Sequence, residues 1–235
     1  MFTKETELFA NESYENISGM MVMGADGTVI SDNLLTKNQE NIQSLGLLVF
    51  DTTNASIKEN HITNNRIGIF MEDASNNTLS RNDVKENYIG LQLKGAEKNE
   101  INKNSFVANV VQGQAQESAT NNTNENYWGD HVGLDMTGDQ RSNLAYQVDP
   151  FFLTVTNDYP VFQLLFQAPG MIFLEQLIHT PVDQQFVDQY PLMQDPLAAS
   201  DNLPQHSFIM LSVCMSLLIF SVSIMYLGVK RNEKI

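Results

Sequence analysis

Residues 56–77 (SIKENHITNNRIGIFMEDASNN) and residues 78–99 (TLSRNDVKENYIGLQLKGAEKN) are two consecutive copies of one 22-residue pattern. Asparagine recurs at this step in two columns, and apolar residues recur at the same step beside each column. The first column holds Asn60, Asn82, Asn104 and Asn126, and the second holds Asn65, Asn87 and Asn109. A fixed step of this length is typical of a solenoid in which each repeat forms one coil.

Within each copy, apolar and polar residues alternate in short runs, such as Ile69-x-Met71 and Leu91-x-Leu93. This period of two turns every second side chain toward the inside, as in a β-strand. A recurring glycine is expected at a corner of each coil, at Gly46, Gly68 and Gly90. The pattern therefore predicts an all-β fold, a parallel β-helix whose coils stack about 4.8 Å apart. Its stacked asparagines are expected to hydrogen-bond from coil to coil.

The repeat continues toward the N-terminus with one irregular step. Asn33 and Asn60 are 27 residues apart rather than 22, so five extra residues are expected before Gly46. About five coils fit into residues 8–128. We therefore assign residues 1–129 to the coils and residues 130–160 to an Asp/Gly-rich loop that closes the solenoid.

The composition excludes several classes of protein. With 13 basic and 28 acidic residues the net charge is −15, which argues against nucleic-acid binding because phosphate contacts need a basic face. The single cysteine, Cys214, excludes a disulfide framework and a thiolate-cluster metal site. A hydrophobic fraction of 42% is ordinary for a folded chain.

The C-terminal part of the chain has a different character. Residues 161–179 are apolar but interrupted by Pro169-Gly170, which favours a short helix on either side. These helices have two possible roles, capping the last coil or lying on a membrane or permease. The remainder of residues 161–206 is predicted to be a proline-containing linker. Residues 207–229 carry no charge and suffice for one transmembrane helix. The basic tail at 230–235 then orients the C-terminus to the cytoplasm and the solenoid to the outside.

A group of motifs follows the last coil. They are residues 126–130 (NYWGD), 133–139 (GLDMTGD), 159–165 (YPVFQLL) and 190–193 (YPLM). An asparagine-rich β-helix that closes on these motifs resembles the NosD family, and the resemblance covers residues 8–196. Family members usually carry more N-terminal coils, so the chain resembles the C-terminal portion of such a protein. No apolar signal segment follows Met1, which agrees with an N-terminally short form.

The resemblance to the NosD family implies a right-handed parallel β-helix that is exported and is not an enzyme. It further implies that the protein works with an ABC transporter, a membrane permease with its cytoplasmic ATPase. The implied task is to help supply copper to nitrous-oxide reductase, so the expected partners are this reductase or a copper chaperone. The membrane is expected to be contacted through residues 207–229.

Three residues are candidate ligands for transiently bound copper. Cu(I) prefers thioether and thiolate sulfur and accepts imidazole. Met21 and Met23 are expected to point outward from one strand, roughly 6–7 Å apart, and His131 follows the Trp128 coil. The alternatives are ordinary surface packing for the methionines and a structural or solvated role for His131. His61 is expected to stand alone on a turn.

Asp135 and Asp139 are candidate ligands for calcium. They lie in an Asp-rich loop, and carboxylate oxygens are the ligands that Ca²⁺ prefers. The family loop typically continues as D-G-D-G-x-G-D, whereas here Thr137, Gln140 and Arg141 interrupt that pattern. A turn that closes the solenoid without an ion is the competing interpretation.

A carbohydrate-binding or carbohydrate-processing β-helix is the alternative function. Hydrolysis of a glycosidic bond needs two carboxylates about 5–10 Å apart, and Asp51, Glu72 and Asp73 form an acidic patch on neighbouring coils. However, positions 94 and 95 are Lys and Gly, and no aromatic platform for a sugar ring is evident above them. We therefore expect a solvated acidic face and a protein without catalytic activity.

Overall fold

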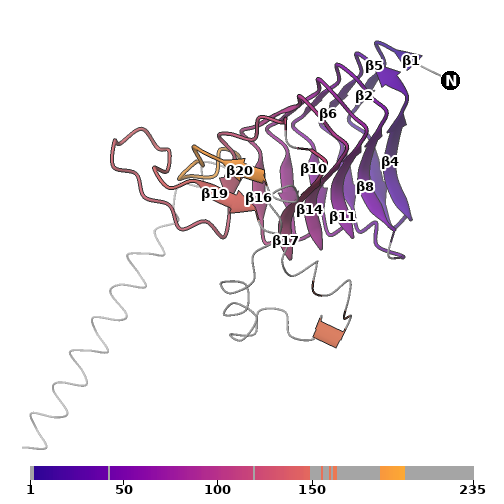
Figure 1. Cartoon of the computed structure of the whole chain (residues 1–235). Helices are drawn as coiled ribbons and strands as arrows, with labels where there is room; N and C mark the ends of the chain where they lie inside the picture. The colour runs from indigo at the N-terminus through magenta and orange to yellow at the C-terminus, as the bar shows by residue number, and fades with distance from the viewer. Residues whose placement is uncertain are drawn as a thin grey trace, which may run out of the picture. The chain divides into compact units, whose positions relative to one another are not determined.

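The chain folds into a parallel β-helix with three sheets (Figure 1). The computed structural model describes residues 3–41, 43–118, 120–148, 155, 159, 161–162 and 186–198. The first sheet contains β2 (Glu7–Phe9), β6 (Val29–Ser31), β9 (Ser56–Lys58), β12 (Thr78–Ser80) and β15 (Glu100–Asn102). The second sheet contains β3 (Glu12–Tyr14), β7 (Leu34–Thr36), β10 (His61–Thr63), β13 (Asp83–Lys85), β16 (Ser105–Val107) and β18 (Tyr127–Trp128).

The third sheet has the longest strands. It contains β4 (Ser18–Met23), β8 (Leu45–Phe50), β11 (Ile67–Glu72), β14 (Ile89–Lys94) and β17 (Val111–Gln116). Two short pairs lie outside the three sheets: β1 (Thr3–Lys4) with β5 (Ala25–Asp26), and β19 (Tyr146–Val148) with β20 (Phe186–Asp188). Only the last pair is antiparallel among the named strands, and the predicted parallel β-helix is confirmed.

The irregular step of the repeat is confirmed as well. Leu34 pairs with Glu12 on one side and with His61 on the other, so the same strand is followed by a longer coil. The extra residues lie in the turn between the end of β7 at Thr36 and the start of β8 at Leu45. The strands before and after this turn stay in register because an enlarged turn does not alter which residues face inward.

The core consists of apolar columns that run along the solenoid axis. Each sheet contributes inward-facing side chains that are fully buried. Examples are Ile57, Leu79 and Ile101 from the first sheet, Ile62, Val84 and Phe106 from the second, and Leu47, Ile69 and Leu91 from the third. Stacking buries them because one coil alone exposes both edges of its apolar interior.

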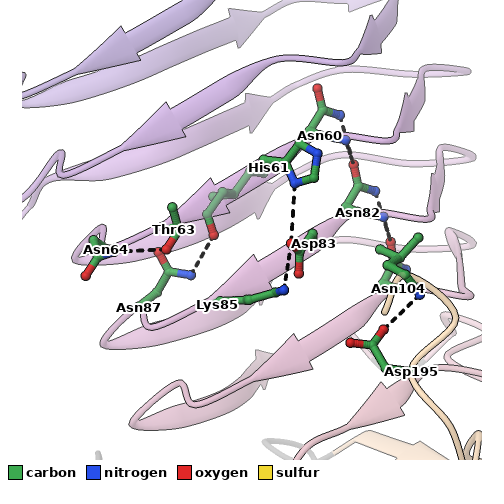
Figure 2. Close-up of polar contacts among 12 residues, drawn as sticks. Asn60, His61, Thr63, Asn64, Asn82, Asp83, Lys85, Asn87, Asn104 and Asp195 are labelled. Carbon is green, nitrogen blue, oxygen red and sulfur yellow. Dashed lines mark hydrogen bonds and ion pairs between the residues drawn. The ribbon is translucent and has the colours of Figure 1, made fainter. Parts of the chain in front are cut away.

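The two asparagine columns form the predicted ladders. In the first ladder Asn60 Nδ2 donates to Asn82 Oδ1 at 2.8 Å, and Asn82 Nδ2 donates to Asn104 Oδ1 at 2.9 Å (Figure 2). The same oxygens accept backbone N–H groups of Asn60 and Asn82. A third ladder, which we did not predict, joins Asn77, Asn99 and Asn121.

The corner prediction for the recurring glycines is wrong. Gly46, Gly68 and Gly90 lie within β8, β11 and β14. A Cβ at position 68 would lie 2.7 Å from Gly90 O and 3.0 Å from Asn87 Nδ2, so glycine is needed for the close approach of neighbouring coils. The corners are made instead by residues with left-handed backbone that precede ladder asparagines, such as Glu59 and Arg81 with φ of 58° and 55°.

Three C-terminal predictions lie largely or wholly outside the described residues. These are the helical segment at 161–179, the membrane helix at 207–229 and the cytoplasmic tail at 230–235. Within the ranges that are described, no helix combines the length and apolar character needed to cross a membrane.

Candidate functional site

The outward methionines lie where the sequence predicted them. Met21 and Met23 of β4 are 53% and 51% exposed, whereas Val22 between them is buried in the core. In the neighbouring strand they pair with Leu48 and Phe50. The face therefore offers two thioethers beside apolar side chains, and its register neighbours on β8 supply no further metal-binding atom.

The C-terminal end of the solenoid is covered by residues 130–148 and 186–197, which we call the closing cap. Trp128 lies on the last coil with its ring stacked on Phe106 at 4.6 Å and on Tyr146 at 4.8 Å between ring centroids. Trp128 is 1% exposed. The apolar core therefore ends in an aromatic stack whose outermost ring belongs to the cap.

Asp188 ends the first asparagine ladder. Its Oδ2 accepts the backbone N–H of Asn126 at 2.8 Å and the indole N–H of Trp128 at 3.0 Å. Its Oδ1 accepts the backbone N–H groups of Glu125 and Tyr190. Burial raises the pKa of the Asp188 carboxyl, while these four hydrogen bonds act in the opposite direction.

The position of Asp188 was not predicted. We assigned residues 186–197 to a proline-containing linker, but Phe186–Asp188 forms β20 and the following residues bond to the last coil through Leu192 N–H and Asn126 O at 2.9 Å. The four polar partners of Asp188 lie up to 63 residues away in sequence. No local pattern marks such a contact, because the repeat itself has already ended.

His131 lies in the closing cap against two other side chains. Its Nε2 is 3.1 Å from Ser142 Oγ, and its ring meets Tyr146 edge-on at 5.3 Å between centroids. Tyr146 in turn donates its hydroxyl to Asp130 Oδ1 at 2.8 Å. His131 is therefore positioned by the same aromatic stack that closes the core.

Met193 joins this group from a distant part of the sequence. A Cβ at position 133 would lie 2.6 Å from Met193 Sδ and 3.0 Å from Ser142 Oγ, so both atoms border Gly133. The backbone N–H of Met193 donates to Gln140 O at 2.9 Å, which fixes the start of the side chain. The sequence motif at 190–193 was visible, but its proximity to Gly133 and Ser142 was not.

Asp135 and Asp139 organise the loop of the closing cap. Asp135 accepts backbone N–H groups of Thr137, Gly138 and Gln140 at 3.1, 2.7 and 3.0 Å. Asp139 Oδ1 accepts the Thr137 hydroxyl and the Arg141 N–H. These bonds are those of a closed turn, and the proposal that both carboxylates bind calcium stays a prediction.

We expect the Asp135 turn to open in acid. Its backbone hydrogen bonds, the bond from Gly138 first, lower the pKa of the Asp135 carboxyl. A lowered pKa in the folded state stabilises the turn above the ordinary value of 3.8, and this contribution is lost as the pH falls through the folded pKa. The protection of the Gly138 amide from hydrogen exchange, relative to an unstructured amide at the same pH, should therefore fall in acid. In Asp135→Ala this protection should be low at every pH, and unchanged protection in that variant would contradict the assignment.

The expectation that His61 stands alone is wrong. His61 Nδ1 is 3.3 Å from Asp83 Oδ2 on the next coil, and Lys85 Nζ is 2.9 Å from the same oxygen (Figure 2). The adjacency follows from the register, which pairs His61 with Asp83. The second oxygen, Asp83 Oδ1, is buried without a hydrogen-bond partner, as is Ser105 Oγ on the following coil.

The acidic patch of the third sheet is partly neutralised. Glu72 Oε1 accepts Lys94 Nζ at 2.7 Å, and this bond raises the pKa of Lys94. Asp51 and Asp73 follow the ends of β8 and β11 in left-handed backbone. Across the described part of the chain, no three His, Cys, Asp or Glu side chains are grouped so that they could hold a metal ion.

Comparison with known proteins identifies the family. Residues 1–137 match the family model described as "Periplasmic copper-binding protein (NosD)", which is more than half of the chain. No curated protein matches the sequence. The extent of the family match and the asparagine-laddered parallel β-helix agree, and the chain therefore belongs to the NosD family.

Proposed function

We propose that this chain is a non-catalytic, extracytoplasmic accessory protein that handles copper during maturation of nitrous-oxide reductase. In this proposal it works beside an ABC transporter, contacts the membrane through residues 207–229, and meets the reductase or a copper chaperone. Copper is its cargo and is bound transiently. The observation that carries the proposal is the match over residues 1–137 to a family described as periplasmic and copper-binding.

The chemistry of the exposed side chains supports this proposal. Met21 and Met23 present two thioethers on one face, and thioethers select Cu(I) over harder ions. Glu72 of the acidic patch is paired with Lys94, and Asp135 of the closing cap accepts backbone N–H groups. The net charge of −15 favours the approach of a cation.

Copper binding by the full chain tests the proposal. The protein is titrated with Cu(I) in competition with a chromogenic chelator, and we expect one or more equivalents to be held. The Met21→Leu/Met23→Leu variant should lose the binding that belongs to the outer face, whereas Met136→Leu, which removes another exposed methionine, should not. A wild-type chain that leaves all copper on the chelator would overturn the copper role.

The partner role needs a separate measurement. Nitrous-oxide reductase is produced with the ABC permease and ATPase, with and without this chain, and its copper content is determined. We expect less copper in the reductase when the chain is omitted. Equal copper content would overturn the maturation role and leave copper binding as a separate result.

A further inference from the structure

A contiguous group of apolar side chains covers part of the outward face of the third sheet. The five strands of this sheet lie side by side (Figure 1), and in each strand the side chains that alternate with core residues point away from the solenoid. Leu48 pairs with Met21 on one side and with Phe70 on the other. Phe50 pairs with Met23. These five side chains, which we call the outer patch, are therefore neighbours on adjacent strands.

The outer patch is accessible to solvent. Met21 and Met23 are 53% and 51% exposed, and Phe50 and Phe70 are half-buried. Leu48 at the centre is 7% exposed, although it does not belong to the core cluster. A contiguous apolar patch on the outside of a folded domain is typical of an interaction site.

The coils themselves do not require apolar side chains at these positions. Leu48 and Phe70 are followed in register by Gln92 and Gln114 on the next two strands. Because these coils share one strand pairing and one register, glutamine is compatible with this column of the sheet. The stacking of coils therefore does not explain the apolar residues of the outer patch.

The same face carries no net charge. Glu72 and Lys94 are the only charged residues of its five strands, and Glu72 Oε1 lies 2.7 Å from Lys94 Nζ. β14 and β17 add the outward side chains of Gln92, Gln114 and Gln116, whose amides both donate and accept hydrogen bonds. Apolar groups, a neutral ion pair and amides can each face a copy of themselves, as an isologous interface requires.

We propose that two copies of this chain pack the outward faces of their third sheets together, with the outer patches against each other in a two-fold symmetric interface. This inference goes beyond the proposed copper role and does not depend on it. A second copy fits this face better than a basic partner does, because Glu72, the single acid of the five strands, is already paired with Lys94. It also fits better than an anionic lipid surface, which would need free Lys or Arg side chains to offset the net charge of −15.

The size of the face predicts a weak dimer. Five strands of six residues, with strands ~4.8 Å apart and residues ~3.3 Å apart, cover roughly 500 Å². A stable interface buries about 800 Å² on each partner, so the dimer should depend on protein concentration. Because each copy carries a charge of −15, salt should strengthen the dimer by screening the repulsion between copies. An interface held by opposite charges would instead weaken as salt is added.

Energy transfer between labelled copies measures the association of the full chain. Copies labelled at the N-terminus with a donor or an acceptor fluorophore are mixed in non-ionic detergent with a metal chelator, and the transfer is followed against protein and salt concentration. We expect Leu48→Gln/Phe70→Gln to raise the dissociation constant at least about tenfold. Gln92→Leu enlarges the outer patch and should lower the dissociation constant. Thr78→Gln, on the outward face of the first sheet, is the matched control and should change nothing.

A further variant separates this proposal from the copper role. Met21→Leu/Met23→Leu removes both thioethers but keeps the outer patch apolar, so it should leave the dimer intact. The chelator removes copper from the measurement, and a failure of the dimer therefore leaves the copper role standing. A chain that binds no copper can likewise still form the dimer.

Cross-linking locates the interface when the double glutamine variant folds poorly. In the Cys214→Ser chain, Phe70→Cys should couple to its own copy through a short bifunctional thiol reagent, and Thr78→Cys should not. Equal yields at the two positions overturn the proposed face. A dimer that persists in the folded Leu48→Gln/Phe70→Gln variant overturns it as well, as does a wild-type chain that stays monomeric in high salt at the highest concentration reached.

Discussion

Asn104→Ala should destabilise the solenoid by about 5 kcal/mol, because buried polar groups that lose their partner each cost about 1–3 kcal/mol. Asn104 Oδ1 accepts the backbone N–H and the Nδ2 of Asn82, both at 2.9 Å. Its own Nδ2 donates to Leu79 O at 2.8 Å and to Asn126 Oδ1 at 2.9 Å. Asn104 is fully buried, so water cannot replace these bonds. Urea unfolding followed by circular dichroism measures the loss.

Two variants sharpen this experiment. Asn102→Ala lies in the same coil but removes an outward, partly exposed side chain, and should cost less than about 1 kcal/mol. Asn104→Asp keeps both acceptor bonds to Asn82 but buries a carboxylate against Leu79 O and Asn126 Oδ1, so it should cost at least as much as alanine. Equal stability of Asn104→Ala and Asn102→Ala would show that the ladder contributes no more than an ordinary surface amide.

Asp188→Ala should open the C-terminal end of the core at a cost of about 4 kcal/mol, since it leaves two backbone N–H groups of the last turn and an indole N–H without an acceptor. Asp188 is fully buried and accepts hydrogen bonds from Asn126, Trp128, Glu125 and Tyr190. The loss should appear as a lower thermal midpoint and as increased exposure of Trp128 in its fluorescence spectrum.

Asp188→Asn distinguishes the contribution of the acceptor oxygens to stability from that of the negative charge. The amide keeps one oxygen and avoids the burial of a charge, so we expect about half the effect of alanine. Asp195→Ala is the matched control, because Asp195 Oδ1 accepts a single N–H from Leu197. An Asp188→Ala variant no less stable than Asp195→Ala would contradict this role.

The raised pKa of Asp188 determines whether the stability of the chain rises or falls with pH. A pKa raised above the unfolded value contributes stability that is fully present below 3.8 and is lost as the pH rises through the folded pKa. The wild-type chain should show this loss and Asp188→Asn should not, when the two are compared by urea unfolding across acidic pH. A steeper loss in Asp188→Asn would reverse the assignment.

The coils could be predicted in detail because each of their features repeats. Asn60, Asn82 and Asn104 occur at one fixed step, so their stacking follows once the fold is recognised. The same step determines which methionines of β4, Met21 and Met23, face outward. The glycines were misplaced because a corner and a close approach of two coils both select glycine, and only the surrounding atoms at Gly68 distinguish them.

The closing cap could be predicted only in part. The motif at 126–130 indicated the end of the repeat, and His131 was singled out for its chemistry. Asp188 and Met193 come from a segment with no periodic pattern, and their contacts depend on how one loop returns to the last coil. Contacts of that kind depend on how the segments pack in three dimensions. The spacing of residues in a single sequence does not reveal them.

The asparagine ladder has a direction. From Asn11 through Asn33 and Asn60 to Asn104, each side-chain amide donates one hydrogen bond to the asparagine of the coil of higher residue number. Its carbonyl oxygen faces the opposite way. Because aligned amide groups, each with a dipole of about 3.5 D, add head to tail, the column carries its positive pole at the Asn126 end. A carboxylate suits that pole, and Asp188 supplies one there by accepting the backbone N–H of Asn126, whose side-chain N–H groups bond to Ile101 O and Thr123 O. The two ends of the ladder are therefore chemically different, and a carboxylate suits only the Asn126 end.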